Sequence, residues 1–355
     1  MAQKTNSGRF FEDFTLGETI IHATPRTVTT GDQSLYTALY GTRFAVNSSA
    51  EFARGLGLDQ APIDDLLVFH IVFGKTVPDV SLNAVANLGY AGGRFGVPVF
   101  PGDTLATTST VIGLKPNANG QTGVVWVRST GTNQHGQMVL DYVRWVMVRR
   151  RAPGTDIAAT HNCPPTDIPA TVATADLAVP QGLDARGFDL ALSGEPHCFE
   201  DYQPGERIDH VDGMTIEEAE HMLATRLYQN TAKVHFNQLE AGQNRFGRRL
   251  IYGGHIISMA RALSFNGLAN VVRIAAINAG SHANPTFAGD TIHAWSEVLS
   301  AEPMPGRGDL GALRLRLIAV KNRAAADWPL KDSDGKYLSD VVLDLDYTVL
   351  MPRRG

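Results

Sequence analysis

The sequence predicts an α+β protein made of two copies of one unit, each with an antiparallel sheet wrapped around a buried helix. Three observations support this fold class. The chain matches itself when shifted by 188 residues, each copy contains a largely apolar segment, and each copy ends in alternating apolar and polar residues. Alternation is typical of half-buried strands, whereas a helix that is apolar on nearly every side is buried in a core. Helix and sheet layers around one core follow for each copy.

The duplication is the strongest of these observations. The self-match runs without a gap over residues 11–63 and continues after a one-residue gap, with a few residues inserted late in copy two. Matching segments are Phe11-Glu12-Asp13 with Phe199-Glu200-Asp201, Leu39-Tyr40 with Leu227-Tyr228, Gly102-Asp103-Thr104 with Gly289-Asp290-Thr291, and Val139-Leu140-Asp141 with Val342-Leu343-Asp344. An internal repeat determines how the rest of a sequence is interpreted. Each difference between the copies can therefore be examined for its effect on function.

The duplication divides the chain into two domains, residues 1–150 and 194–355. Residues 151–193 between them are rich in Pro, Ala, Thr and Asp and lack sustained periodicity, which indicates a linker. The linker is expected to cross from one copy to the other.

Helix signals are clearest in copy two. Thr215 and Glu218 predict a capping box that opens a helix running to about Tyr228. A second, buried helix is expected from about Gly254. In copy one, Asp64 and Asp65 are expected at the N-cap of the equivalent buried helix.

The later part of each copy predicts antiparallel strands. Residues 124–127 and 138–148 flank the turn His135-Gly136, and residues 313–320 and 341–349 flank Asp334-Gly335. The sheets of the two copies are expected to join into one continuous sheet, because pairing of edge strands removes exposed hydrogen-bonding groups. His22 and His210 occupy equivalent positions and are expected to belong to the shared fold.

Composition narrows the function classes. The 355 residues carry a net charge of −5 and are 43% hydrophobic, which gives no indication of nucleic-acid binding. No apolar run approaches about 18 residues and the N-terminus lacks an apolar signal core, so a cytoplasmic protein without membrane contact is expected. Cys163 and Cys198 are the only cysteines and lack metal-ligand spacing with nearby histidines. Neither a disulfide framework nor a metal site is expected.

Two segments resemble a known family, YQNTAKVHFN and the later RRLIYGGHIISMA. They resemble the core pattern of the MaoC-type (R)-specific enoyl-CoA hydratases, which is roughly Gly-Asp-x-Asn-Pro-x-His-x-Asp followed by Ile-x-His-Gly-Met. His235 falls on the family histidine and Gly254 on the glycine of the second motif. The resemblance covers both copies and implies a tandem, or double, hot-dog fold.

The chain departs from that pattern at several positions. Asn230 stands where the family has its catalytic aspartate, and Asn237 where it has the second one. Gly253 and His255 replace the residues on either side of the motif glycine. Because asparagine cannot accept a proton, the resemblance indicates the location of the site better than its proton-transfer groups.

The comparison of the copies supports the same location. At the position of His235 copy one has Asn47, and at the position of Gly253-Gly254 it has Asp65-Leu66. Addition of water to a thioester-conjugated double bond needs a group that exchanges protons near neutral pH, as histidine does. It also needs donors directed at the thioester oxygen, and the N–H groups of a helix N-terminus provide them. Copy two is therefore predicted to be catalytic, and copy one to keep the shape and help bind CoA.

Roles follow for individual residues. His235 is expected to handle the proton and the water, Asn230 to hold that water, and the N–H of Gly254 or His255 to polarise the carbonyl, with Gly253 allowing close approach. Arg245, Arg248 and Arg249 are expected to bind CoA phosphates or a substrate carboxylate, because arginine binds such groups in bidentate fashion. A solvated loop is the alternative for these arginines. The sequence does not rank the candidates for an additional carboxylate, which are Glu217, Glu218 and Glu240.

The function implied by the resemblance is that of a hydro-lyase. It would interconvert a branched C4-dicarboxylic enoyl-CoA and its 3-hydroxyacyl-CoA, with CoA as part of the substrate and no further cofactor. The expected partner is this small acyl-CoA molecule, with no nucleic acid and no membrane, and a homo-oligomer is expected. Two alternatives stand beside it. One is another (R)-specific enoyl-CoA hydratase or 3-hydroxyacyl thioester dehydratase, and the other is a non-catalytic acyl-CoA-binding protein. A pure binder has no reason to keep His235 and the glycine pair in one copy only.

Overall fold

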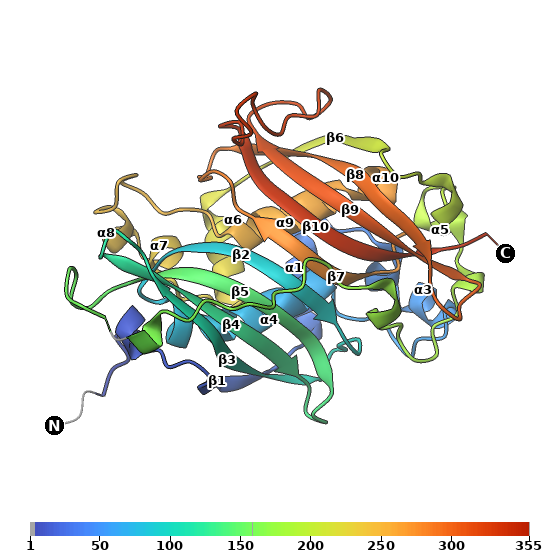
Figure 1. Cartoon of the computed structure of the whole chain (residues 1–355). Coiled ribbons are helices and arrows are strands. Elements are labelled where there is room, and N and C mark those ends of the chain that lie inside the picture. The colour runs from blue at the N-terminus through green and yellow to red at the C-terminus, as the bar shows by residue number, and fades with distance from the viewer. Residues whose placement is uncertain (1–3, 158, 355) are drawn as a thin grey trace.

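A ten-stranded antiparallel sheet runs through the computed structural model, which describes residues 4–157 and 159–354 (Figure 1). The strand order is β1-β3-β4-β5-β2-β7-β10-β9-β8-β6. The strands are β1 (Thr19–Thr27), β2 (Ala84–Phe95), β3 (Thr104–Pro116), β4 (Thr122–Thr132), β5 (Met138–Arg149), β6 (Arg207–Thr215), β7 (Arg273–Ser281), β8 (Thr291–Pro303), β9 (Leu310–Lys321) and β10 (Val341–Pro352). Each half of the order comes from one copy of the repeat.

The two halves join through β2 and β7, where Tyr90 is paired with Gly280 and Arg94 with Ala276. The prediction of one continuous sheet is thus confirmed. Only β1 and β6 remain as edge strands, and both contain a shift in register that interrupts their pairing. Such irregularities protect an edge from pairing with another chain.

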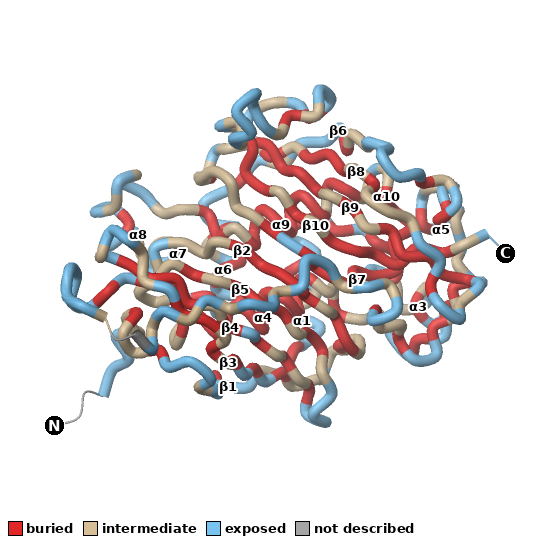
Figure 2. Tube along the Cα trace, in the orientation of Figure 1, coloured by how far each residue is buried: buried red, intermediate tan, exposed pale blue. Residues whose placement is uncertain are grey.

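In each copy the sheet wraps around one helix, and the two helices begin at equivalent positions of the repeat. These helices are α4 (Asp65–Thr76) and α9 (Gly253–Leu263). Every residue of α4 after Asp65 is buried, and α9 is buried except at Gly253 and Ala262 (Figure 2). Asp64 caps α4, since its carboxylate accepts a hydrogen bond from the Leu66 N–H at 2.8 Å. Both buried helices and this cap agree with the sequence prediction.

Further helices surround these elements. They are η1 (Phe11–Asp13), α1 (Thr30–Tyr40), α2 (Ala45–Ser48), α3 (Ala50–Gly55), η2 (Val77–Ser81), η3 (Ala159–His161), η4 (Thr174–Asp176), η5 (Ala185–Gly187), α5 (Leu190–Ser193), η6 (Phe199–Asp201), α6 (Glu218–Leu227), α7 (Lys233–Phe236), α8 (Gln238–Ala241) and α10 (Phe265–Leu268).

The helix expected to open at Thr215 begins later. It is α6, which starts at Glu218 after the N-cap residue Glu217, and no side chain caps it. Thr215 instead ends β6, where its hydroxyl lies 2.8 Å from that of Thr291 on β8. The capping-box prediction was wrong because pairing with β8 extends the strand through Thr215.

Equivalent residues of the two copies meet where α4 and α9 pack. The hydroxyls of Tyr40 and Tyr228 lie 2.6 Å apart, and His70 Nε2 lies 2.8 Å from Ser258 Oγ. Both pairs are separated by 188 residues, the shift of the repeat. They therefore lie beside a pseudo-two-fold axis that relates the copies.

The equivalent histidines His22 and His210 have the structural surroundings expected of the shared fold. Both are buried, and each places Nε2 2.8 Å from a serine hydroxyl of the neighbouring strand, Ser109 or Ser296.

Residues 151–157 and 159–193 form the segment that crosses the face of the sheet opposite α4 and α9 (Figure 1). The backbone of Cys163 forms an isolated antiparallel β-bridge with Leu114 of β3. The Val172 N–H donates to Asn278 Oδ1 of β7 at 2.8 Å. Further along, Pro180 and Leu183 lie beside Asn47. Asn47 is the equivalent of His235, so this part of the crossing segment covers the region of copy one that corresponds to the surroundings of His235.

Candidate active site

The candidate site lies at the start of α9, between the two copies. His235 is on α7, and Asn230 lies between α6 and α7. Gly253 and Gly254 open α9, and a Cβ placed on Gly254 would lie 2.6 Å from His70 of α4. The structure thus brings the motif residues of copy two against side chains of copy one.

His235 is held with one ring nitrogen available. Its Nδ1 lies 2.8 Å from the carbonyl oxygen of Leu250. Because a carbonyl only accepts, Nδ1 carries the proton and Nε2 keeps its lone pair. Burial lowers the pKa of His235 to about 4, although the residue keeps part of its surface exposed. The imidazole is therefore neutral near pH 7 and able to accept a proton.

Asn230 is 1% exposed and its side chain is oriented by the backbone. The Oδ1 atom accepts a hydrogen bond from the Ala232 N–H at 3.1 Å. The side-chain amide nitrogen carries two further hydrogens. Asn230 can therefore act toward a ligand as a donor.

The first turn of α9 presents backbone N–H groups. The His255 N–H donates to the Tyr252 carbonyl at 2.9 Å, whereas no residue in the described ranges accepts from the N–H of Gly253 or Gly254. His255 itself is buried, and its Nδ1 lies 2.7 Å from the Tyr40 hydroxyl. Unoccupied N–H groups at a helix N-terminus favour an anion or a developing oxyanion.

The packing around Gly253 and Gly254 leaves no room for a side chain at either position. A Cβ on Gly253 would lie 2.4 Å from Cε1 of His282, and a Cβ on Gly254 would lie 2.4 Å from Cε1 of Tyr252. Both distances are too short for a side chain. The pair therefore does more than start a helix, because it lets aromatic rings pack directly on the backbone.

Two further histidines of copy two belong to the site and were missed in the sequence. His221 Nε2 accepts a hydrogen bond from the Tyr252 N–H at 2.9 Å, which places the His221 proton on Nδ1. The His221 ring centroid lies 6.3 Å from that of His235 and 5.6 Å from that of His255. His282 Nε2 lies 3.2 Å from the Tyr90 hydroxyl of copy one.

These imidazoles are all neutral near pH 7. Burial lowers the pKa of His221 to about 2, of His255 to about 3 and of His282 to about 4. Comparison of the copies contained a signal for both missed residues, because copy one has Gln33 at the position of His221 and Phe95 at the position of His282.

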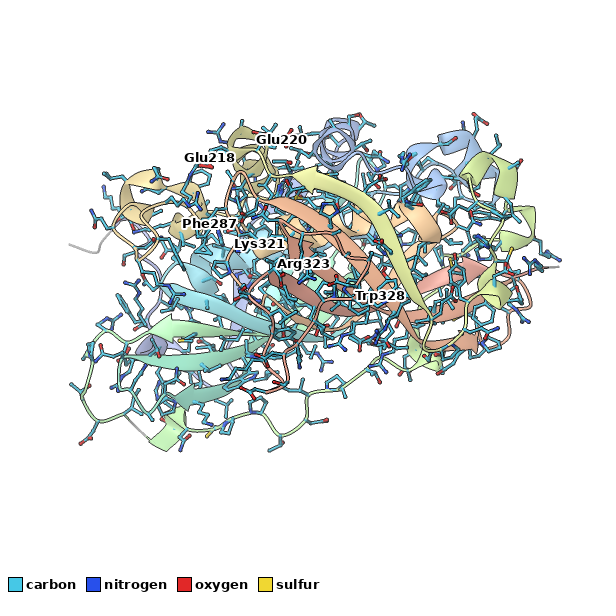
Figure 3. The ribbon with its side chains drawn as sticks, turned by 90° about the horizontal axis from the view of Figure 1, so that it is seen from above. Glu218, Glu220, Phe287, Lys321, Arg323 and Trp328 are labelled. Carbon is cyan, nitrogen blue, oxygen red and sulfur yellow. The ribbon has the colours of Figure 1, made fainter. Side chains whose placement is uncertain are left out.

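The three arginines before the glycine pair differ in their contacts. Arg245 lies over the ring of Phe246 at 4.5 Å and Arg248 over the ring of Phe287 at 3.9 Å, and both are exposed. Arg249 forms an ion pair with Glu218 of α6, and only 12% of its side chain is exposed. The partners of Arg249 and Arg248, which are Glu218 and Phe287, are labelled in Figure 3. Arg245 and Arg248 thus remain accessible to a phosphate, whereas Arg249 already has a carboxylate partner.

The carboxylates considered from the sequence have other surroundings. Glu218 pairs with Arg249, and Glu240 lies 2.9 Å from Lys233 Nζ. Glu217 is exposed at the N-cap of α6. No carboxylate in the described part of the chain hydrogen bonds to His235, whose ring partner is the Leu250 carbonyl.

Two kinds of feature are absent from the described residues. No group of three or more His, Cys, Asp or Glu is arranged to hold a metal ion there. Nor is any helix within those ranges long and apolar enough to cross a membrane.

A sheet that wraps two buried helices, with a histidine and a glycine helix start in one copy, defines a MaoC-like dehydratase of the double hot-dog type. A MaoC domain protein dehydratase from Chloroflexus aurantiacus has a TM-score of 0.96 and 62% identity, and the match covers 100% of both chains. A Mycobacterium tuberculosis protein with a double hotdog fold has a TM-score of 0.77 and 23% identity over 97% of this chain and 99% of that one. The expected fold is confirmed.

The chain belongs to the mesaconyl-CoA hydratase family, whose model matches residues 1–328. The β-methylmalyl-CoA dehydratase of Chloroflexus aurantiacus is 63% identical over 355 residues, which cover 100% of both chains. The mesaconyl-CoA hydratase of Cereibacter sphaeroides is 61% identical over 351 residues, 99% of this chain and 100% of that one. The family resemblance seen in the sequence is confirmed.

Proposed function

We propose that this protein is a hydro-lyase that reversibly adds water to mesaconyl-CoA, which is 2-methylfumaryl-CoA, and forms β-methylmalyl-CoA. One observation carries the chemistry. A neutral imidazole, His235, has its Nε2 available near a helix start whose first N–H groups are unoccupied in the described residues. Copy one has Asn47 in place of the histidine, and its Leu66 N–H, equivalent to that of Gly254, donates to Asp64. The choice of substrate rests on the relatives of 61% and 63% identity named for this reaction.

The proposed reaction uses His235 as the proton carrier. Nε2 accepts a proton from water while the water oxygen forms a bond to C3 of the enoyl group. The electron pair of the C2–C3 double bond moves to C2 and into the thioester carbonyl, whose oxygen gains negative charge. The same proton then passes from Nε2 to C2. A hydrogen and a hydroxyl have been added, and the imidazole is neutral again.

The start of α9 stabilises the charge on the thioester oxygen. The N–H of Gly254 donates to that oxygen, and the positive end of the helix dipole adds to the effect. Glycine at positions 253 and 254 lets the thioester approach the backbone. The Asn230 amide donates to the attacking water and holds it near C3.

The remaining parts of the site bind the carrier. Copy one is proposed to widen the groove for the pantetheine arm of CoA, and the accessible Arg245 and Arg248 to meet the CoA phosphates. CoA enters as part of the substrate, and no other cofactor is proposed. A homo-oligomer in the cytoplasm belongs to the same proposal, and light scattering on the purified protein tests its oligomeric part.

Absorbance at the enoyl-thioester band, followed over a panel of enoyl-CoA thioesters, tests the function. We expect absorbance to fall with mesaconyl-CoA, at a higher kcat/KM than with straight-chain substrates such as crotonyl-CoA. A preference for straight-chain substrates would support the alternative of a general (R)-specific hydratase. Binding of all thioesters without any change in absorbance would instead show a non-catalytic binder.

A further inference from the structure

Arg144 on β5 is a buried cation without a carboxylate partner in the described part of the chain. Its exposed fraction is 0%. Nη2 donates to Thr76 Oγ1 at 2.7 Å and to Ser81 Oγ at 2.9 Å. Nε and Nη1 have no hydrogen-bond partner among the described residues. A buried charge is strongly unfavourable unless it is paired, and these two atoms carry three N–H groups able to receive an acceptor.

Arg144 is connected with the candidate active site through packed aromatic rings. Its guanidinium carbon is 4.3 Å from the ring centroid of Phe73, and the rings of Phe73 and Tyr252 are 5.6 Å apart. The Tyr252 ring is in turn 5.7 Å from that of His235. On the sheet Arg144 is the register partner of Tyr90, whose hydroxyl contacts His282. Two chains of packed aromatic rings thus connect Arg144 with the helix start.

The titratable groups near Arg144 do not provide an anion. They are Tyr90, Tyr142 and Tyr252. Burial raises the pKa of each of these tyrosines, so all three are neutral near pH 7.

Copy two contains a buried arginine in the reverse arrangement. Arg261 on α9 stands at the position of Phe73, and Tyr347 on β10 stands at the position of Arg144. Arg261 is 6% exposed, and burial lowers its pKa, while the charges of Asp64 and Asp65 act in the opposite direction and favour its protonated form. These aspartates occupy the positions of Tyr252 and Gly253. The chain therefore supplies carboxylates at the helix start near Arg261, whereas none of the described carboxylates pairs with Arg144.

We propose that Arg144 binds the free carboxylate of the substrate and so selects dicarboxylic enoyl-CoA thioesters, an inference that rests on the proposed function. In a 2-methylfumaryl group the carboxylate carbon lies about 4 Å from the thioester carbon, the span of one planar trans unit. The carboxylate is attached to C3, the carbon that water attacks. Pairing with the guanidinium offsets the negative charge that opposes this attack.

Binding of two unreactive, saturated thioesters tests the proposal without turnover. Succinyl-CoA carries the terminal carboxylate and butyryl-CoA replaces it with a methyl group. We expect calorimetry to show that the wild-type protein prefers succinyl-CoA. In Arg144→Met the affinity for succinyl-CoA should fall about 30-fold or more, while that for butyryl-CoA stays close to wild type.

A matched control is Arg261→Met, which removes the buried arginine of α9 and should leave the ratio of the two affinities unchanged. If Arg144→Met does not fold, Arg144→Gln keeps donors for Thr76 and Ser81 and should show the same selective loss. Equal losses for both thioesters, or a wild-type protein that binds butyryl-CoA as tightly as succinyl-CoA, would overturn the proposal.

Failure of the proposed function would look different. It would show as an absence of mesaconyl-CoA hydration by the wild-type protein, whatever its preference between the saturated thioesters. A lost preference for succinyl-CoA overturns the role of Arg144 even when hydration is observed.

Discussion

Copy one and copy two place different side chains on equivalent backbone around their buried helices. In copy two, His235 Nδ1 donates to the Leu250 carbonyl at 2.8 Å. In copy one, Asn47 Nδ2 donates to the Pro62 carbonyl at 3.1 Å, and in both cases the acceptor lies 15 residues further along. Asn47 therefore keeps the bond that orients His235 but lacks the second ring nitrogen. The hydrogen bond to the carbonyl is common to both copies and belongs to the fold. Only His235 has a second ring nitrogen, Nε2, that can accept a proton.

The starts of α4 and α9 also carry different side chains. In copy one, the Asp64 carboxylate accepts from the first turn of α4, and Asp65 binds Arg273 at 2.8 Å and the Ile274 N–H at 3.0 Å. The cavity beside Asp65 has a volume of about 10 Å³ and is lined in part by Pro180 of the crossing segment. Copy one thus fills its helix start with its own carboxylates. In copy two the N–H groups of Gly253 and Gly254 have no acceptor among the described residues, which leaves them for the proposed thioester.

The largest expected effect comes from removing the additional nitrogen. His235→Ala should lower kcat by about 10²–10⁴-fold, the usual value of general acid–base assistance, in a protein that remains folded. Asn47→Ala should leave turnover nearly unchanged, because it removes only the orienting bond of copy one. Steady-state kinetics and circular dichroism of both variants check this. Equal losses of activity would refute the assignment of a single active copy.

Exchange of the helix-start residues is the next test. Gly253→Asp should lower kcat/KM by about 10²–10³-fold, because its side chain meets His282 and its charge opposes the developing oxyanion. The mirror change Asp65→Gly should preserve turnover and lower the melting temperature, because Arg273 loses a buried ion pair. If Gly253→Asp were as active as wild type, the helix start of α9 would not bind the thioester oxygen.

Asn230→Asp should have a smaller and selective effect. The new negative charge would repel a substrate carboxylate, so hydration of mesaconyl-CoA should fall about 10-fold or more. Activity with uncharged crotonyl-CoA should survive or rise. The ratio of kcat/KM for the two substrates measures the effect. A change that is the same for both would exclude the idea that Asn230 adapts the site to dicarboxylic substrates.

The smallest effect is expected from pH. His235 acts in its neutral form, and burial lowers its pKa to about 4. Activity should therefore be lost only as pH falls through about 4, and kcat/KM should be nearly constant between about pH 6 and 8. A pH profile in short assays checks this. An acidic limb centred near pH 6.5, the ordinary value for histidine, would mean that His235 titrates as an exposed residue.

Much of the fold could be predicted because the repeat and the apolar periodicity are local properties of the sequence. The starts of α4 and α9 and the joined sheet follow from them. The start of α6 could not be predicted, because pairing of β6 with β8 is a long-range contact that overrides the local capping signal at Thr215.

The candidate site divides in the same way. His235 and the glycine pair are contiguous with the family motif, so the sequence indicates them directly. His70 and Tyr90 come from copy one and meet Gly254 and His282 only through contacts between the copies, which no pattern within one copy reveals. His221 and His282 lie between these cases, because a position-by-position comparison of the copies distinguishes them.

The hydrogen bond between His70 and Ser258 has a consequence for symmetry. Two identical subunits related by a two-fold axis bring the same residue together from both sides, as the paired tyrosines Tyr40 and Tyr228 still do. An imidazole facing a hydroxyl at such a position is not available to a homodimer. Covalent fusion removes this restriction, since a substitution in one half is no longer copied into the other. The centre of the molecule can therefore become chemically one-sided while its backbone remains nearly symmetric.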